Sequence, residues 1–309
     1  MQRFLPILIA LILLFLTAGC NRTQKAAYQK GSDAYEKKDY ATALKWFTSS
    51  AGEGVAVAQF NLGGMYREGE GVPQNDETAV KWYTLAAEQG HAVAQFNLGG
   101  MYFKGEGVPH NDETAVKWYT LAAEQRFTEA QYMLGLMYRL GYGVPQNDQT
   151  AVKLYTLAGE QGYVPAQYWL GLMYGRGQAV PQNHKIALKW WKLAAEQGYV
   201  PAQYNLGLTY YEGRGVSKND ETAVKWYRRA GEQGDATAQY MLGLMYRVGY
   251  GVPQNHVYSH MWFNLAASQG DKDAAKDRDR VTKLMTRSQI ERAQDLASKY
   301  VKKKYKGCD

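Results

Sequence analysis

A period of 36 residues constrains this chain more than any other feature of its sequence. Six alanines stand at this one interval with no insertion between them: Ala58, Ala94, Ala130, Ala166, Ala202 and Ala238. One copy of the repeated unit, residues 94–125, reads AQFNLGGMYFKGEGVPHNDETAVKWYTLAAEQ. A strict internal period of this length is typical of a solenoid, in which each unit buries its apolar surface against its neighbours.

The first half of this unit predicts an amphipathic helix. Its apolar side chains recur at the spacing of one helical face: Ala94, Leu98, Met101 and Tyr102. Gly99 lies in the same face, where glycine costs about 1 kcal/mol relative to alanine, so we expect a neighbouring helix to approach closely there. Gly105 and Pro109 then end the helix near Lys104, because glycine can supply a left-handed cap and proline cannot continue the helix.

The second half predicts another helix of the same kind. Asn111 or Asp112 can cap it by accepting a free backbone N–H, and its apolar stripe is formed by Ala115, Trp118, Tyr119 and Ala122. One hairpin cannot bury both stripes alone, so the copies must stack, and the sequence predicts an all-α fold. We interpret the recurring loop asparagines as helix caps rather than ligands: Asn75, Asn111, Asn147, Asn183, Asn219 and Asn255.

The repeated motif resembles a known family. The pattern Ala-x-x-x-Leu-Gly-x-Met-Tyr, Gly-x-Gly-Val-Pro-x-Asn, then Ala-Val-Lys-Trp-Tyr-x-x-Ala-Ala-Glu-Gln-Gly is similar to that of the Sel-one-like repeat (SLR) family, a relative of the tetratricopeptide repeats. About six full copies, over residues 56–271, carry the resemblance. It implies a right-handed α-solenoid that acts as an adaptor for protein assemblies, and it implies no particular partner.

The segments on either side of these copies extend the same pattern. Residues 20–55 are predicted to form a shorter, tetratricopeptide-like hairpin, because Trp46 keeps the repeat spacing with Trp82. Residues 272–309 are predicted to form C-terminal capping helices and a basic tail, with Ser288 as the cap of the last helix. No linker interrupts the period, so we expect one elongated domain.

The first residues are typical of a secretory signal peptide. One basic residue precedes an apolar run of about fifteen residues, too short for the ~20 of a spanning helix. The end of this run, Leu16 to Cys20, resembles a bacterial lipobox, although Thr17 stands where leucine is favoured. The resemblance implies removal of residues 1–19, acylation of Cys20, and, because Asn21 follows, sorting to the outer membrane on its periplasmic side. Ordinary cleavage to a soluble periplasmic protein and an uncleaved anchor remain alternatives.

The sequence carries few features that indicate catalysis, cofactor binding or nucleic acid binding. The chain contains no Gly-Lys-Ser/Thr phosphate loop, no Gly-x-Ser-x-Gly elbow and no Cys-x-x-Cys pair. His256 and His260 have the i, i+4 spacing of two zinc ligands, but Val257 stands where a metalloprotease has glutamate, so we interpret both as non-ligands. The net charge is +7, and the basic residues are scattered among acidic ones through the repeats. This arrangement argues against nucleic acid binding. We therefore predict no catalytic residue, metal or cofactor.

Partner binding is expected in the concave groove that the family resemblance implies. Positions that vary between copies while facing this groove are predicted to read the partner: Arg67, Phe103, Arg139, Arg176, Tyr211 and Arg247, above Leu136, Leu172, Leu208 and Leu244. By resemblance to tetratricopeptide geometry an aromatic series also faces the groove, although packing between repeats is the favoured interpretation: Phe60, Phe96, Tyr132, Tyr168, Tyr204 and Tyr240.

These features predict a non-catalytic protein-interaction scaffold, anchored by lipid in a bacterial envelope. Two alternatives come from other classes. A glycan-binding or polysaccharide-export component would stack sugars on the aromatic series, and an envelope hydrolase acting on β-lactams or the cell wall would need a nucleophile or carboxylate pair. Cys308, near the end of the basic tail, allows a minor disulfide-linked dimer.

Overall fold

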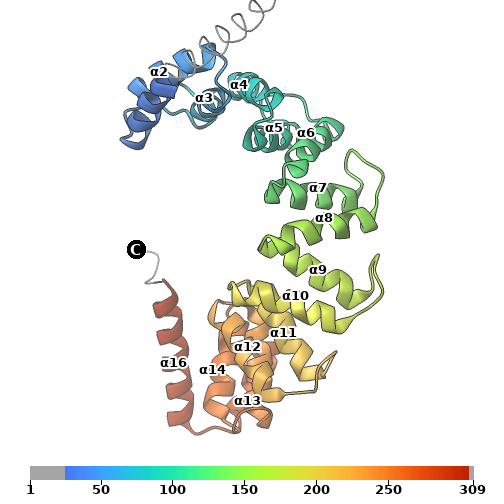
Figure 1. Cartoon of the computed structure of the whole chain (residues 1–309). Coiled ribbons are helices and arrows are strands. Elements are labelled where there is room, and N and C mark those ends of the chain that lie inside the picture. Colours follow the sequence, from blue (N-terminus) through green and yellow to red (C-terminus); the bar gives the residue numbers. More distant parts are fainter. Residues whose placement is uncertain (1–24, 306–309) are drawn as a thin grey trace, which may run out of the picture. The chain divides into compact units, whose positions relative to one another are not determined.

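The computed structural model describes residues 25–305, with side chains through residue 302, and this part of the chain consists of helices joined by turns, without strands. Helical hairpins stacked as in a solenoid confirm the predicted all-α class (Figure 1). The chain divides into two compact units, residues 1–154 and 155–309, within α8 (Asp148–Glu160). A single elongated domain was expected. The division is physically reasonable because each solenoid repeat contacts only its neighbours, so no common core unites a long array.

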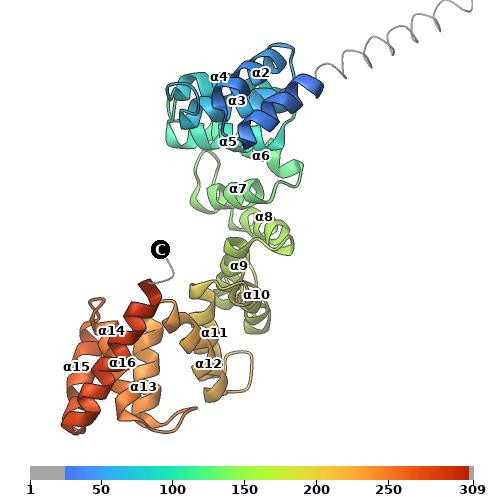
Figure 2. The same ribbon diagram turned by 90° about the vertical axis from the view of Figure 1, so that its left-hand side faces the viewer.

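The first unit begins with a helix over residues 25–36 and continues through six more complete helices. These are α2 (Tyr40–Gly52), α3 (Ala56–Glu68), α4 (Asp76–Glu88), α5 (Ala92–Lys104), α6 (Asp112–Glu124) and α7 (Thr128–Leu140). Within each hairpin α3 packs on α4 and α5 on α6, and each second helix also packs on the first helix of the next hairpin (Figure 2).

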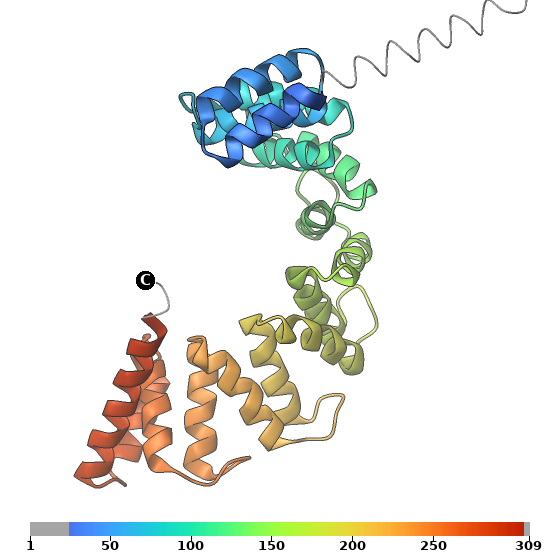
Figure 3. The same cartoon turned by 60° about the vertical axis from the view of Figure 1, so that its left-hand side comes forward.

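The second unit repeats this arrangement from α9 onward. Its helices are α9 (Val164–Arg176), α10 (His184–Glu196), α11 (Val200–Glu212), α12 (Asp220–Glu232), α13 (Ala236–Val248), α14 (His256–Ala267), α15 (Lys272–Thr282) and α16 (Arg287–Tyr305). Helix α15 follows α14 as the first helix of another hairpin would. Helix α16 packs along α14 (Figure 3).

Local signals place the helix ends where the sequence predicts them. Helix α5 ends at Lys104, and Gly105 adopts the left-handed conformation with φ 74° while its N–H donates to the Met101 carbonyl. The Asn111 side chain accepts a 2.8 Å hydrogen bond from the Thr114 N–H at the start of α6. All six loop asparagines cap a helix in this way, which confirms their interpretation as caps.

The prediction that Ser288 caps the last helix is wrong. Helix α16 begins at Arg287, and Thr286 precedes it. The Thr286 hydroxyl accepts a hydrogen bond from the Gln289 N–H, and the Gln289 side chain accepts one from the Thr286 N–H at 2.9 Å. This reciprocal capping box satisfies two N-terminal donors, whereas a cap at Ser288 would leave the residues before it outside the helix.

The close approach expected at the helical glycines is confirmed. A Cβ at Gly99 would lie 2.9 Å from Cδ1 of Tyr119, on the second helix of the same hairpin. Because no side chain intervenes, the tyrosine ring fills this space and is buried to 2% exposure. The repeated alanines are also fully buried, and Ala94 and Ala130 share core clusters with residues of the preceding hairpin: Ala58, Ala94, Ala130, Ala166, Ala202 and Ala238.

Buried glutamines, which the sequence did not single out, connect successive hairpins. Gln95 donates from Nε2 to the Ala87 carbonyl at 3.0 Å, and its Oε1 accepts from Nε2 of Gln125 at 2.7 Å. The same pair of bonds recurs at Gln59, Gln167, Gln203 and Gln239. A buried amide without partners would cost stability, so these bonds help to fix how one hairpin sits on the next.

The C-terminal end of the second unit is closed by two different helices. Helix α15 carries the charged run from Lys276 to Arg280, in which Asp277 is buried to 5% exposure. Asp277 accepts from Arg247 at 3.1 Å and from Arg280 at 2.8 Å. Helix α16 contributes Ala297 and flanking apolar side chains to the core cluster that contains Trp262.

Candidate functional site

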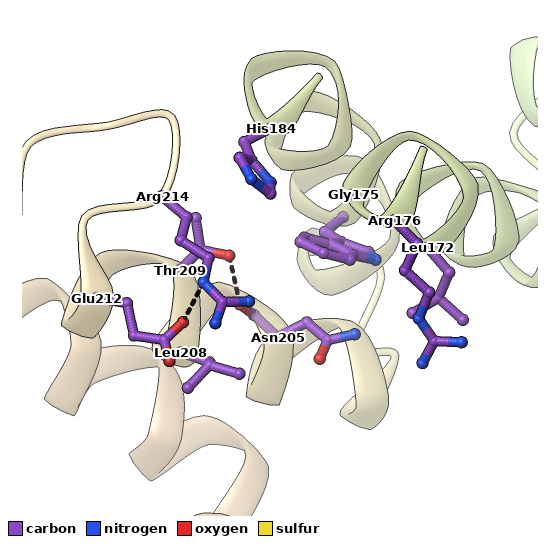
Figure 4. A pocket seen from close by; sticks show the side chains of 10 residues that line it. Leu172, Gly175, Arg176, His184, Asn205, Leu208, Thr209, Glu212 and Arg214 are labelled. Atoms are coloured by element: carbon purple, nitrogen blue, oxygen red, sulfur yellow. Dashed lines mark hydrogen bonds and ion pairs between the residues drawn. The ribbon is translucent and has the colours of Figure 1, made fainter. Parts of the chain in front are cut away.

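A pocket of about 170 Å³ lies between the first helices α9 and α11, beside α10. We call it the first-helix pocket and define it by its lining residues: Leu172, Gly175, Arg176, His184, Trp191, Asn205, Leu208, Thr209, Glu212 and Arg214. Figure 4 shows Leu172 and Arg176 on α9, facing Asn205, Leu208 and Glu212 on α11. The pocket lies within the second unit.

Two departures from the repeat coincide at this pocket. Position 191 holds tryptophan where the other full copies hold tyrosine or phenylalanine, and position 175 holds glycine where they hold arginine, phenylalanine or tyrosine. A Cβ at Gly175 would lie 3.1 Å from Cη2 of Trp191. The larger indole therefore occupies space beside α9, and the missing side chain at position 175 leaves the pocket open above it.

Charged side chains surround the mouth of the pocket. Arg176 ends α9, His184 begins α10, and Arg214 lies in the loop after α11. The Arg214 Nε is 2.6 Å from a carboxylate oxygen of Glu212. Gly215 holds this loop against α10, since a Cβ there would lie 2.7 Å from the Cβ of His184. Three basic groups and one acidic group thus border an apolar floor.

The structure brings together three of the predicted groove residues, Leu172, Arg176 and Leu208. Arg176 is one position out of the repeat spacing, because Gly175 is the true equivalent of the other five upper positions. The spacing argument therefore selected Arg176 incorrectly, although its side chain does line the pocket.

The other predicted groove residues have contacts of their own. Arg67 pairs with Glu106 at 3.5 Å, Arg247 pairs with the buried Asp277, and Nζ of Lys218 lies 5.1 Å from the Tyr211 ring. The remaining members are half-buried on their helices: Phe103, Leu136, Arg139 and Leu244. The Phe103 ring lies beside the rings of His110 and Tyr142. Leu244 packs on the core cluster that contains Phe263. Arg247 is thus engaged in an ion pair with a buried carboxylate of its own unit.

Ring contacts support packing as the role of the aromatic series. Phe60 lies 5.8 Å from the ring of Tyr83 and stacks at 4.7 Å on His91. Equivalent contacts join Phe96 to Tyr119, Tyr204 to Tyr227 and Tyr240 to Phe263. These faces are engaged within and between hairpins, which leaves less surface for sugar stacking than the glycan-binding alternative requires.

The structure shows no grouped metal ligands within residues 25–305. His260 is 3% exposed and its Nδ1 has no hydrogen-bond partner. Burial lowers the pKa of His260, and the nearby Arg278 acts in the same direction while Asp279 opposes it. A buried neutral imidazole on the inner side of α14 is therefore a packing residue in this structure.

Several expectations lie outside the described residues. These are the signal peptide, acylation of Cys20, and a disulfide through Cys308, and all three stay predictions. Among the helices that the structure does describe, none combines the length and the apolar character needed to cross a membrane.

Comparison with known proteins identifies the class to which this fold belongs. The family model described as Sel1 repeat matches residues 25–55, 56–91, 92–127, 128–163, 164–199, 200–235 and 236–271, so the chain belongs to the Sel1 repeat family. Proteins of this family generally act as non-catalytic scaffolds for protein–protein interaction. No curated protein sequence matches the chain.

Two solved structures show the same fold. A Sel1 repeat protein from Oxalobacter formigenes is 34% identical, with a TM-score of 0.66 over 78% of this chain and 96% of that one. A protective antigen present in uropathogenic Escherichia coli strains, which displays an SLR fold, is 29% identical, with a TM-score of 0.59 over 90% of this chain and 68% of that one.

Proposed function

We propose that the chain is a non-catalytic interaction scaffold of a bacterial envelope, exported and held at the periplasmic face of the outer membrane by acyl chains on Cys20. The general role of Sel1 repeat proteins supports the scaffold function. The short apolar leader that ends at Cys20 supports export and anchoring. Several acyl chains on one residue hold stably, because each buried methylene contributes about 0.8 kcal/mol.

The first-helix pocket is the proposed site of partner capture, and an extended protein segment that carries a carboxylate is its proposed occupant. Arg176 and Arg214 stand on different helical repeats at the pocket mouth, and an apolar floor of Leu208 and Trp191 lies between them. A guanidinium group binds a carboxylate through two parallel hydrogen bonds. Arginine and tryptophan beside an apolar floor also match the composition of binding hot spots.

Glu212 determines which of the two arginines is available to a partner carboxylate. Its carboxylate already pairs with Nε of the Arg214 guanidinium, at 2.6 Å. Because Glu212 already pairs with Arg214, the exposed Arg176 is the more available cation. A partner carboxylate is therefore expected beside Arg176, with the apolar part of the segment against Leu208.

The proposal is tested by capturing partners from a cross-linked envelope fraction and identifying them by mass spectrometry. Replacing Arg176 and Arg214 together with alanine should remove the captured partner, with a loss of about 2 kcal/mol or more of affinity. High salt should weaken capture by the unmodified chain, because the contact is between charges near the surface.

The matched control replaces Arg287 and Arg292 together with alanine. Both lie exposed on α16, so this variant loses the same charge without touching the pocket. If the control loses the partner and the pocket variant retains it, the pocket proposal is refuted. Unchanged far-ultraviolet circular dichroism of both variants shows that the fold is intact.

A further inference from the structure

A second groove lies on the opposite set of helices from the first-helix pocket. It has a volume of about 540 Å³ and we call it the second-helix groove, defined by Gly159, Glu160, Gly162, Gln167, Lys189, Trp190, Leu193 and Gln197. Trp190 and Leu193 form its apolar part on α10. Leu193 is 40% exposed, although it is a large aliphatic side chain.

The same groove exists two repeats later in this chain, and there it is filled. Adding two repeat lengths to Trp190 and Leu193 gives Trp262 and Leu265 on α14. Helix α16 covers both: the Trp262 ring meets the Tyr300 ring edge to face at 5.4 Å, and Leu265 is only 5% exposed. The lining of the groove around α16 is otherwise shared, with Glu232, Gly234, Gln239 and Gln269 in place of Glu160, Gly162, Gln167 and Gln197.

A glycine at the base distinguishes these two grooves from the others. Gly159 and Gly231 stand where positions 87, 123 and 195 carry alanine. A Cβ added at Gly159 would lie 3.3 Å from Cζ3 of Trp190, and a Cβ added at Gly231 would lie 3.4 Å from Cζ3 of Trp262. The missing methyl group gives the indole room in both places. The open groove thus has the floor that accepts α16.

The intervening repeat shows how such a groove is closed. Position 229, equivalent to Leu193 and Leu265, is arginine, and its guanidinium carbon lies 4.6 Å from the centroid of the Trp226 ring. This cation–π contact covers the indole from within the chain. Of these three successive second helices, α14 is covered by α16, α12 by its own arginine, and α10 by neither.

We infer that the second-helix groove binds an amphipathic helix of a partner protein, which presents an aliphatic and an aromatic side chain four residues apart, as Leu296 and Tyr300 of α16 do. The α16 helix of a second copy is a poorer occupant because Ala293 and Ala297 are already buried in its own chain. Lys189 stands where the filled groove has Met261, and its aliphatic stem can cover the same apolar surface. This inference does not depend on the first-helix pocket.

The test uses a fluorescent peptide of residues 287–305, the sequence of α16, titrated with the purified full chain and followed by anisotropy. Saturable binding with one peptide per chain is expected. Leu193→Arg, which copies the natural closure at position 229, should weaken binding by about tenfold or more. Arg229→Leu alone should leave the stoichiometry at one, because Ala195 stands at the base of the intervening groove where the open groove has Gly159. A peptide with alanine at positions 296 and 300 is the control ligand.

Three outcomes overturn the inference. The first is that the peptide fails to bind. The second is that it binds the Leu193→Arg variant as tightly as the unmodified chain, which would mean that the peptide displaces the chain's own α16. The third is concentration-dependent dimerisation, seen by sedimentation and abolished by Leu193→Arg, which would make a second copy the occupant. Both substituted side chains are exposed, so circular dichroism should report an unchanged fold.

Discussion

Arg126→Gly should stabilise the first unit. Arg126 follows α6 with φ 65°, in the left-handed region, where the equivalent glycines have φ between 85° and 95°. Its N–H still donates to the Ala123 carbonyl at 2.9 Å, as that of Gly90 does to Ala87 at 3.0 Å, so the turn itself is conserved. The side chain is exposed. The cost at this position is therefore mainly the backbone conformation.

The magnitude follows from two opposing terms. The left-handed conformation costs an L-residue about 1–2 kcal/mol. Replacing arginine with glycine removes this cost but adds about 0.5–1 kcal/mol, because glycine loses more conformational freedom on folding. The net gain is about 0.5–1 kcal/mol, which corresponds to a rise in melting temperature of roughly 2–4 °C per kcal/mol for a unit of this size.

Urea and thermal unfolding followed by circular dichroism measure this effect. Ala179→Gly is an independent test in the second unit, because Ala179 has φ 60°. Glu124→Gly is the opposite control: Glu124 is exposed and helical at the end of α6, so glycine there should only destabilise. An unchanged or lower melting temperature for both Arg126→Gly and Ala179→Gly would refute the reasoning from backbone strain.

Three further predictions concern other parts of the chain. Cys20→Ser should block processing and leave the leader attached, whereas mass spectrometry of a native mature terminus at another residue, without lipid, would contradict acylation. Gly107→Ala should destabilise the first unit far more than Gly90→Ala, since both have positive φ but only at Gly107 would a Cβ overlap the backbone of the preceding hairpin; equal melting temperatures would argue against this contact. Burial lowers the pKa of His260, so the folded chain binds this proton less readily than the unfolded chain does, and the stability of the fold decreases as pH falls below about 6.5; His260→Gln should reduce the loss of melting temperature on acidification, and a variant that loses as much as the unmodified chain would contradict this.

The sequence predicted the fold well because its signals are local. Each helix end depends on residues within a few positions of it, such as Gly105 or Asn111, and the stripe of buried alanines follows from periodicity alone. The misplaced cap at Ser288 shows the limit of this reasoning. Thr286 and Gln289 act as a pair, and the charged and polar residues around them offered several equivalent starts.

The first-helix pocket was predictable only in part. The expected series included Leu172 and Leu208 as the apolar floor beneath the variable upper positions, and both line the pocket. It missed Trp191 and Gly175, since their significance lies in the fit between an enlarged ring and a missing side chain sixteen residues away. A search for copies in which two facing positions depart from the repeat together would have indicated this pair. The ion pair of Arg247 also depends on Asp277, which lies beyond the last full repeat.

The hydrogen bonds of the buried glutamines favour changes in chain length that add or remove whole repeats. Residues 76–89 and 112–125 are identical, so unequal exchange between their coding sequences would add or delete one 36-residue unit. Each glutamine bonds to a carbonyl eight residues before it and to a glutamine thirty residues after it. A gain or loss of whole units regenerates both bonds, whereas a deletion that removes one partner of a bond and leaves the other would leave a buried amide unpaired. The array can therefore gain or lose hairpins during evolution while every junction stays chemically the same.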